Sequence, residues 1–339
     1  MSADSTIPNF RILVVGAGGV GTLVCVALER SLQASVTAVL RSNFDQVNRH
    51  GFEIESIDHG KLSGWRPSAV VNCIPSADPS EPFEYIVVTM KNVPETTDLP
   101  SIIGPAVKQG YTTIVLIQNG LYIEETIAQA FPACVILSGV SYVSAHERNG
   151  HVVQDSRDRL ALGAYHSPSL DNEYENSKLR EFSSIYGAAK VKVEIVEDIV
   201  LYRWRKLLWN GTFNTMCAIT QLDTSAIRRF GEHTMIRPAM TEMAAVAKAD
   251  GYDLGDDIVD VIIDSIPEGL SIRPSMLVDI DKGNPIEVQV ILGNALQIAR
   301  RRGVQTPILD STYQFLKLIQ ARLLAAREYL SASIESSHR

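Results

Sequence analysis

Residues 11–21 read RILVVGAGGVG, and this stretch decides the fold of the first part of the chain. Its aliphatic start is typical of a buried parallel strand, and the residues that follow it, 22–32, have helical periodicity. The spacing G-x-G-x-x-G between them predicts a dinucleotide-binding turn, because the glycines let a pyrophosphate approach a helix N-terminus. A plain glycine-rich turn is the alternative. We call the turn the glycine loop and expect all of it to hold the nucleotide: Gly16, Ala17, Gly18, Gly19, Val20 and Gly21.

The end of the next expected strand, 35–40, bears on which nicotinamide nucleotide is bound. NAD enzymes usually carry Asp or Glu there to bind the ribose 2′-hydroxyl. Here the strand is followed by Arg41, Ser42 and Asn43, with no acid. A guanidinium and a hydroxyl suit a 2′-phosphate, so Arg41 favours NADP. The alternative is that Arg41 is a solvated loop residue.

Two further expected strands, 85–90 and 112–117, are each followed by a polar residue of interest, Lys91 and Asn119. Ligands of open parallel sheets lie beyond the carboxyl ends of the strands, so we expect both residues at the cofactor or substrate. An Asn before a glycine is also a common turn residue. A strand at 134–140 completes a doubly wound sheet, whereas 51–72 reads as a hairpin excursion. We expect antiparallel strands at 141–164 to extend the sheet and 191–196 to be a last strand.

Residues 198–220, DIVLYRWRKLLWNGTFNTMCAIT, predict one long helix that is apolar over most of its circumference and therefore buried. Lys206, Asn210 and Asn214 interrupt it at i, i+4 and i+8, so they drift only about 80° around the axis and span about 12 Å along it. A buried ammonium needs a partner or a wet cleft. A ligand site, a satisfied core network and a lysine that snorkels to solvent all remain open.

From Asp198 onward the chain shows almost only helical periodicity, in stretches at 233–250, 256–265, 285–302 and 308–330. We therefore predict an α/β chain with a Rossmann-like, doubly wound NADP-binding domain at 1–197. An all-α substrate and catalytic domain follows at 198–339. The length of 339 residues suits two domains. The last helix is mostly apolar and could serve an interface, so a homodimer is one expectation.

The composition of the chain indicates which classes of partner are disfavoured and which cellular compartment is expected. The net charge of −8, without a long basic run, argues against nucleic acid. No apolar run approaches the roughly 18 residues that span a bilayer, and the N-terminus lacks a secretion signal. The four cysteines are widely spaced in apolar stretches, as reduced thiols of a cytoplasmic protein would be. The seven histidines lack metal-ligand spacing, so we expect no metal site.

The motifs, taken in order, resemble those of the ketopantoate reductase family. The resemblance covers essentially the whole chain; the glycine loop is generic, whereas the Lys–Asn–Asn helix and the Ser-Met-Leu/Glu pair are specific. It implies NADPH-dependent reduction of 2-dehydropantoate to pantoate, a step towards pantothenate, in a cleft between a Rossmann domain and a helical domain. The matching segments are the glycine loop, TMK at 89–91, QNG at 118–120, K-x-x-x-N-x-x-x-N at 206–214, SMLVD at 275–279 and IEV at 286–288.

The resemblance also implies roles for single residues. Lys206 would be the proton donor. The substrate would be bound by Asn119, Lys206, Asn210, Asn214, Ser275 and Glu287. The nucleotide would be bound by Gly16, Ala17, Gly18, Gly19, Val20, Gly21, Arg41, Lys91, Asn119 and Glu287. Local sequence offers alternatives, because Asn284 to Glu287 also reads as a capping box and Ser275 as a helix N-cap.

Two positions depart from the family's pattern. Bacterial members carry further substrate-side asparagines where this chain has Thr224 and Ile272. The reaction class is unaffected, but the identity of the 2-oxo acid is open. The competing hypotheses are a related NADP-dependent reductase for a different 2-oxo or 3-hydroxy acid, and an NADP-sensing module without chemistry.

Overall fold

The computed structural model describes residues 10–267 and 269–337, with backbone alone for 330–337. The chain divides into two compact units. The first unit contains the chain up to Lys91 and the segments Thr97–Gln118 and Ile123–Ile199. The second unit contains everything from Val200 onward together with two short excursions, Asn92–Thr96 and Asn119–Tyr122. Two segments from within the first 197 residues are thus part of the helical unit.

The first unit is built on an eight-stranded sheet in the order β12-β11-β8-β7-β6-β1-β2-β5. Neighbouring strands run parallel except at β11, which pairs with β8 in the antiparallel sense. From β1 the chain first builds one side of the sheet and then crosses to β6 on the other side, which makes a topological switch point. The strands are β1 Phe10–Val15, β2 Ala34–Val39, β5 Ala69–Val71, β6 Tyr85–Val88, β7 Thr113–Leu116, β8 Ile136–Ser141, β11 Arg159–Ala164 and β12 Lys192–Ile195.

A second sheet of four strands has the order β4-β3-β10-β9. The predicted hairpin at Asn149 and Gly150 is confirmed, and both residues have positive φ, as a tight two-residue turn requires. The prediction that antiparallel strands at 141–164 extend the main sheet is confirmed for β11, which pairs with β8. It is wrong for the hairpin, because β10 pairs with β3 instead. The pairing places Val152 beside Ile54, and both are buried in the core that contains the helix after the glycine loop. The strands are β3 Phe52–Ser56, β4 Gly60–Trp65, β9 Ala145–Arg148 and β10 His151–Gln154.

The helices of the first unit are mostly short. Helix α1, Gly19–Arg30, begins in the glycine loop, and its residues 21–28 are buried. Helix α5, Asn172–Gly187, packs Phe182 between Tyr85 of β6 and Tyr186, with ring centroids 5.2 and 6.0 Å away. The remaining helices are α2 Phe44–His50, α3 Leu99–Ile103, the short 3-10 turn η1 Gly104–Ala106, and α4 Glu125–Ala130.

The second unit is helical, as predicted. The helix expected at 198–220 is continuous, but it widens into a π-helical turn, η2 Asn210–Asn214. Gly211 lies in this turn and leaves room for the end of the Met243 side chain, because a Cβ on it would lie 2.5 Å from Met243 Cε. The elements are α6 Ile199–Trp209, η2, α7 Thr215–Thr220, α8 Thr224–Gly231, η3 Glu232–Ile236, α9 Arg237–Ala249, α10 Ile258–Asp264, α11 Ser275–Asp281, η4 Gln289–Gly293, α12 Asn294–Arg302 and α13 Pro307–Ser337.

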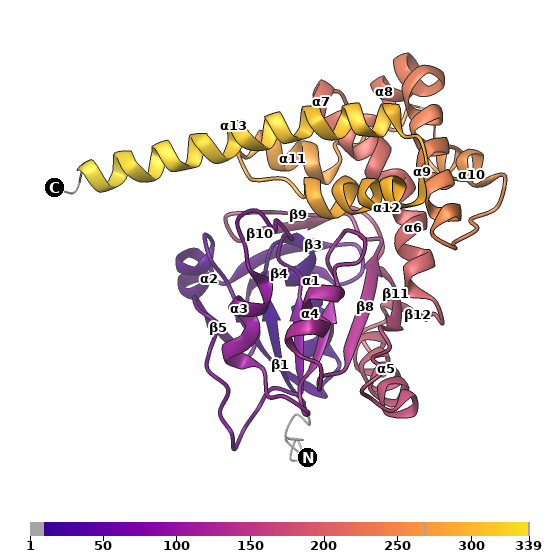
Figure 1. The fold of residues 1–339 in the computed structure, drawn as a ribbon. Coiled ribbons are helices and arrows are strands. Elements are labelled where there is room, and N and C mark those ends of the chain that lie inside the picture. Colours follow the sequence, from indigo (N-terminus) through magenta and orange to yellow (C-terminus); the bar gives the residue numbers. More distant parts are fainter. Residues whose placement is uncertain (1–9, 268, 338–339) are drawn as a thin grey trace. The chain divides into compact units, whose positions relative to one another are not determined.

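Helix α13 extends well beyond the other helices of its unit (Figure 1). Leu309, Leu316 and Leu323 bury one face of it, whereas Phe315 and Leu318 are exposed on another. That α13 forms an interface with a second copy of the chain stays a prediction. Among the described residues, no helix is both long and apolar enough to cross a membrane.

Candidate functional site

The glycine loop has the geometry of a phosphate-binding turn. A Cβ on Gly21 would overlap the carbonyl oxygen of Gly16, so only glycine lets helix α1 start this close to β1. A Cβ on Gly18, by contrast, would meet nothing within 4 Å. The backbone at Gly18 therefore faces open space directly before the N-terminus of α1, where helix N–H groups favour an anion. These residues fit a dinucleotide pyrophosphate.

Asn43 ties the segment after β2 to the glycine loop, a role that the sequence did not reveal. Its buried amide donates to the carbonyl of Ala17 at 3.1 Å and to Glu147 Oε1 at 3.3 Å. Arg41 and Ser42, which precede it, are exposed. The exposed guanidinium of Arg41 is thus two residues before Asn43, which contacts the glycine loop, and this location suits a 2′-phosphate.

The ends of the central strands are joined to the same loop. Thr89 donates a hydrogen bond to the carbonyl of Gly16, and Gln118 Nε2 donates to the carbonyl of Met90 at 2.6 Å. These bonds connect the carboxyl ends of β1, β6 and β7 at the switch point. Lys91, which follows Met90, is exposed.

A row of charged and polar side chains lies within the helical unit. Lys206 Nζ donates to Asn119 Oδ1 at 2.8 Å, and Asn119 Nδ2 donates to Glu287 Oε2 at 3.4 Å. The other carboxylate oxygen of Glu287 accepts from the backbone N–H of Asn92 at 3.0 Å. Lys206 and Asn119 are half-buried, and Glu287 is 4% exposed. We call Lys206, Asn119 and Glu287 the lysine row.

The other two members of the predicted stripe behave differently from Lys206. Asn214 is fully buried; its Oδ1 accepts from the N–H of Met276 at 2.9 Å and its Nδ2 donates to Ser275 Oγ at 3.3 Å. Asn214 therefore caps helix α11 from a neighbouring helix. Asn210 is 5% exposed, and within the described part of the chain its side-chain amide makes no recorded hydrogen bond. Asn214 thus holds helix α11, whereas Asn210 makes no such bond, and the substrate roles of both residues stay predictions.

Both local alternatives for the later motif are wrong. In a capping box the N–H of Asn284 would bond to Glu287, but it donates to the carbonyl of Asp279 at 2.8 Å. Ser275 is exposed and is the first residue of α11, after an N-cap at Pro274, so the cap comes from Asn214. The sequence contains one hint of this cap: the helix that starts at Ser275 follows a proline, which has no capping side chain, so another residue such as a buried Asn must supply the cap.

The two departures from the family's pattern lie side by side. The Thr224 hydroxyl donates to the carbonyl of Leu270 at 2.9 Å and accepts from the N–H of Ile272 at 3.0 Å. Thr224 is fully buried, and these two bonds hold the segment that leads to Ser275. Ile272 is half-buried and apolar.

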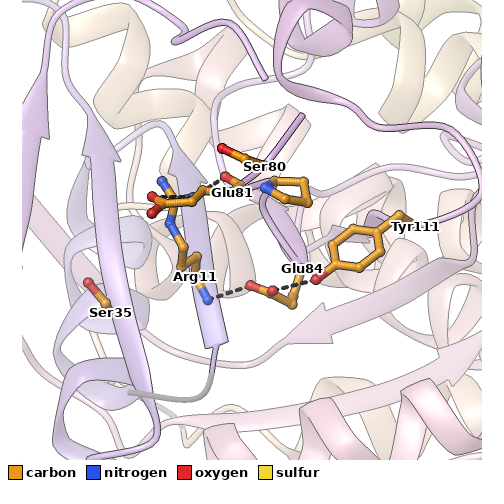
Figure 2. Close-up of a pocket in the computed structure, with 7 residues that line it drawn as sticks. Arg11, Ser35, Ser80, Glu81, Glu84 and Tyr111 are labelled. Carbon is orange, nitrogen blue, oxygen red and sulfur yellow. Dashed lines mark hydrogen bonds and ion pairs between the residues drawn. The ribbon is translucent and has the colours of Figure 1, made fainter. Parts of the chain in front are cut away.

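A pocket in the first unit lies at the other end of the strands, near the start of β1, β2, β6 and β7 (Figure 2). Its charged groups have partners: the Arg11 guanidinium lies 3.2 Å from Glu81 Oε2. Glu84 accepts from the backbone N–H of Arg11 at 2.6 Å and from the Tyr111 hydroxyl at 2.5 Å. That bond to Glu84 raises the pKa of Tyr111 to about 12. The pocket is remote from the glycine loop, and we do not assign it a role in catalysis. Among the described residues, no group of three or more His, Cys, Asp or Glu could hold a metal ion.

Comparisons of the sequence and of the structure with known proteins point to one family. A family model described as Ketopantoate reductase PanE/ApbA matches residues 12–167, and the model of its C-terminal part matches residues 198–320. An uncharacterized protein of Saccharomyces cerevisiae is 34% identical, over 92% of this chain and 94% of its own length. The crystal structure of 2-dehydropantoate 2-reductase from Methylococcus capsulatus is 32% identical, with a TM-score of 0.79 over 92% of this chain and 97% of that one. D-mandelate dehydrogenase, solved with NADH and anilino(oxo)acetate, is 20% identical and shares the fold, with a TM-score of 0.78 over 92% of this chain and 99% of that one.

Proposed function

The chain belongs to the ketopantoate reductase family, and we propose that it uses NADPH to reduce 2-dehydropantoate to pantoate. The observation that carries the proposal is the lysine row, in which a half-buried ammonium is directed by Asn119 and Glu287. Asn210, one helical turn from Lys206, is nearly buried, and its amide makes no hydrogen bond within the described part of the chain. A lysine and a buried amide arranged in this way are better explained by a polar substrate that binds both of them.

Lys206 is the proton donor in this proposal. The hydride for the carbonyl carbon comes from the reduced nicotinamide, and negative charge grows on the carbonyl oxygen. An ammonium has three N–H donors, and Asn119 accepts from one of them, which fixes the direction of the group. Lys206 can then stabilise the oxyanion and transfer a proton to it. Asn210, one turn further along, suits a hydrogen bond to the carboxylate or the hydroxyl of the oxo acid.

The nucleotide is held by the first unit. Gly18 faces open space before α1, so the pyrophosphate can approach the helix N-terminus. We infer NADP rather than NAD because Arg41 follows β2 where an acid would bind a 2′-hydroxyl. Lys91 at the carboxyl end of β6 is a further cation for the nucleotide.

Arg41→Ala is expected to raise KM for NADPH about tenfold to a hundredfold, because it removes charge-assisted hydrogen bonds to the 2′-phosphate. KM for NADH should not change. Steady-state kinetics with both nucleotides measures the ratio, and Arg49→Ala, an exposed arginine on α2, is the matched control. An unchanged KM for both nucleotides would show that Arg41 is merely solvated, and equal rises for both would show that it does not recognise the 2′-phosphate.

A second candidate function is the reduction of another 2-oxo acid by the same chemistry. The hydroxyl proton of Thr224 is already donated to Leu270, and Ile272 beside it is apolar. This side of the helical unit therefore offers a substrate fewer hydrogen-bond donors than two asparagines would. The experiment is NADPH oxidation with 2-dehydropantoate beside analogues that lack its hydroxyl. A higher kcat/KM for 2-dehydropantoate supports the proposed substrate, and a higher value for an analogue supports the second candidate.

A further inference from the structure

The loop Asn119–Tyr122 is fixed to the helical unit through its backbone. The carbonyl of Gly120 accepts from Arg203 at 2.9 Å, and Arg203 is 3% exposed on α6. The carbonyl of Leu121 accepts from Asn294 Nδ2 at 2.7 Å. These bonds act on the residues directly after Asn119, whose side chain accepts the hydrogen bond from Lys206. The direction of that side chain therefore depends on how the loop is held.

The loop is also held in an unfavourable backbone conformation. Gly120 has φ of +110° and Tyr122 has φ of +53°. A left-handed conformation costs little at glycine but is disfavoured for an aromatic residue, so the surroundings must enforce it. Room for a side chain is lacking at Gly120, because its Cβ would lie 2.6 Å from Val290 Cβ. The N–H of Leu121 donates to the carbonyl of Val290 at 2.9 Å, which keeps the two segments in register.

One side-chain bond closes the loop at its far end. The Tyr122 hydroxyl donates to Asp250 Oδ2, at the residue that follows α9. The Asp250 side chain is 10% exposed, and its other oxygen lies 3.9 Å from an Arg302 nitrogen. Burial and the bond to Asp250 raise the pKa of Tyr122 well above its ordinary value, so the phenol remains a donor. A strained residue fastened in this way indicates a functional constraint on its neighbours.

We propose that Tyr122 is a positioning residue: its bond to Asp250 holds the strained loop so that Asn119 Oδ1 stays directed at Lys206. Tyr122 itself touches neither reactant. Its effect on the reaction passes through Asn119, and this catalytic part of the inference rests on the proposed function.

Tyr122→Phe removes the hydroxyl and keeps the ring. We expect kcat with 2-dehydropantoate to fall about tenfold, with KM for NADPH within twofold of the native value. Amide hydrogen exchange at Leu121 should become about tenfold faster, a readout that needs no substrate. Asp250→Ala should give the same loss, and Asp250→Asn, which keeps an acceptor for the phenol, should restore most of kcat. Tyr111→Phe, which removes a tyrosine–carboxylate bond in the first unit (Figure 2), is the matched control and should leave kcat unchanged.

Native kcat together with native exchange in Tyr122→Phe would overturn the inference, as would a loss of kcat without faster exchange. An Asp250→Asn variant as impaired as Asp250→Ala would also contradict it, because the hydrogen bond would then not be the cause. If the native chain reduces no 2-oxo acid, the proposed function fails. Hydrogen exchange at Leu121 then decides by itself whether this bond holds the loop.

Discussion

Lys206→Ala is expected to lower kcat for the reduction of 2-dehydropantoate about a hundredfold to ten-thousandfold, the range of a lost general acid. The Kd for NADPH should remain at its native value, because Lys206 belongs to the helical unit and the glycine loop to the first. Lys206 Nζ donates to Asn119 Oδ1 at 2.8 Å, so the substitution removes a directed proton donor and its positive charge together. Single-turnover NADPH oxidation and fluorescence titration of NADPH measure the two quantities.

Arg205→Ala is the matched control for this variant. It removes one positive charge from the neighbouring position of α6, where the side chain is exposed. Its kcat should stay within about twofold of the native value, because surface changes outside binding contacts have small effects. A Lys206→Ala enzyme with near-native turnover would eliminate Lys206 as the proton donor.

Gly18→Asp is expected to weaken NADPH binding about a hundredfold or more, which corresponds to about 2.7 kcal/mol. A side chain at this position points into open space, so the fold should tolerate it. The carboxylate, however, would stand before the N-terminus of α1, in the space we assign to the pyrophosphate, and would repel it. Isothermal titration with NADPH gives the loss, and thermal unfolding should show a Tm close to the native value.

Gly18→Asn separates charge from bulk, because it has the same shape as Asp without the charge. We expect it to bind NADPH at least about tenfold more tightly than Gly18→Asp. Equal affinities of the two variants would mean that no phosphate lies at this position, and native affinity of Gly18→Asp would remove the glycine loop from the cofactor site.

The parts of the fold with a strong local signal were predictable from the sequence. The run at 11–21 predicted a strand, a glycine turn and a helix, and the structure contains β1, the loop and α1 there. The helix at 198–220 was equally clear from its apolar periodicity. Its π-helical turn at Asn210–Asn214 was not, because a widened turn leaves the apolar pattern almost unchanged and depends on packing at Gly211. The i, i+4, i+8 spacing therefore predicted that Lys206, Asn210 and Asn214 form a more regular row than the structure contains.

Features set by tertiary contacts could not be predicted. The hairpin at Asn149 had a clear turn signal, but which strand it joins is decided by the core that buries Val152. Asn214 looked equivalent to Asn210, yet it caps α11, a helix about 60 residues later in the chain. The membership of Asn119 in the helical unit depends on bonds from side chains such as Asn294, far along the sequence.

The central claim is that this chain catalyses reduction of a 2-oxo acid and does not merely bind NADP. The most direct test is to incubate the purified chain with NADPH and 2-dehydropantoate and to follow nucleotide absorbance and product together. The account predicts that NADPH is oxidised only when the oxo acid is present, with one pantoate formed for each NADPH consumed. Tight binding of NADPH without oxidation by 2-dehydropantoate or any related 2-oxo acid would contradict it.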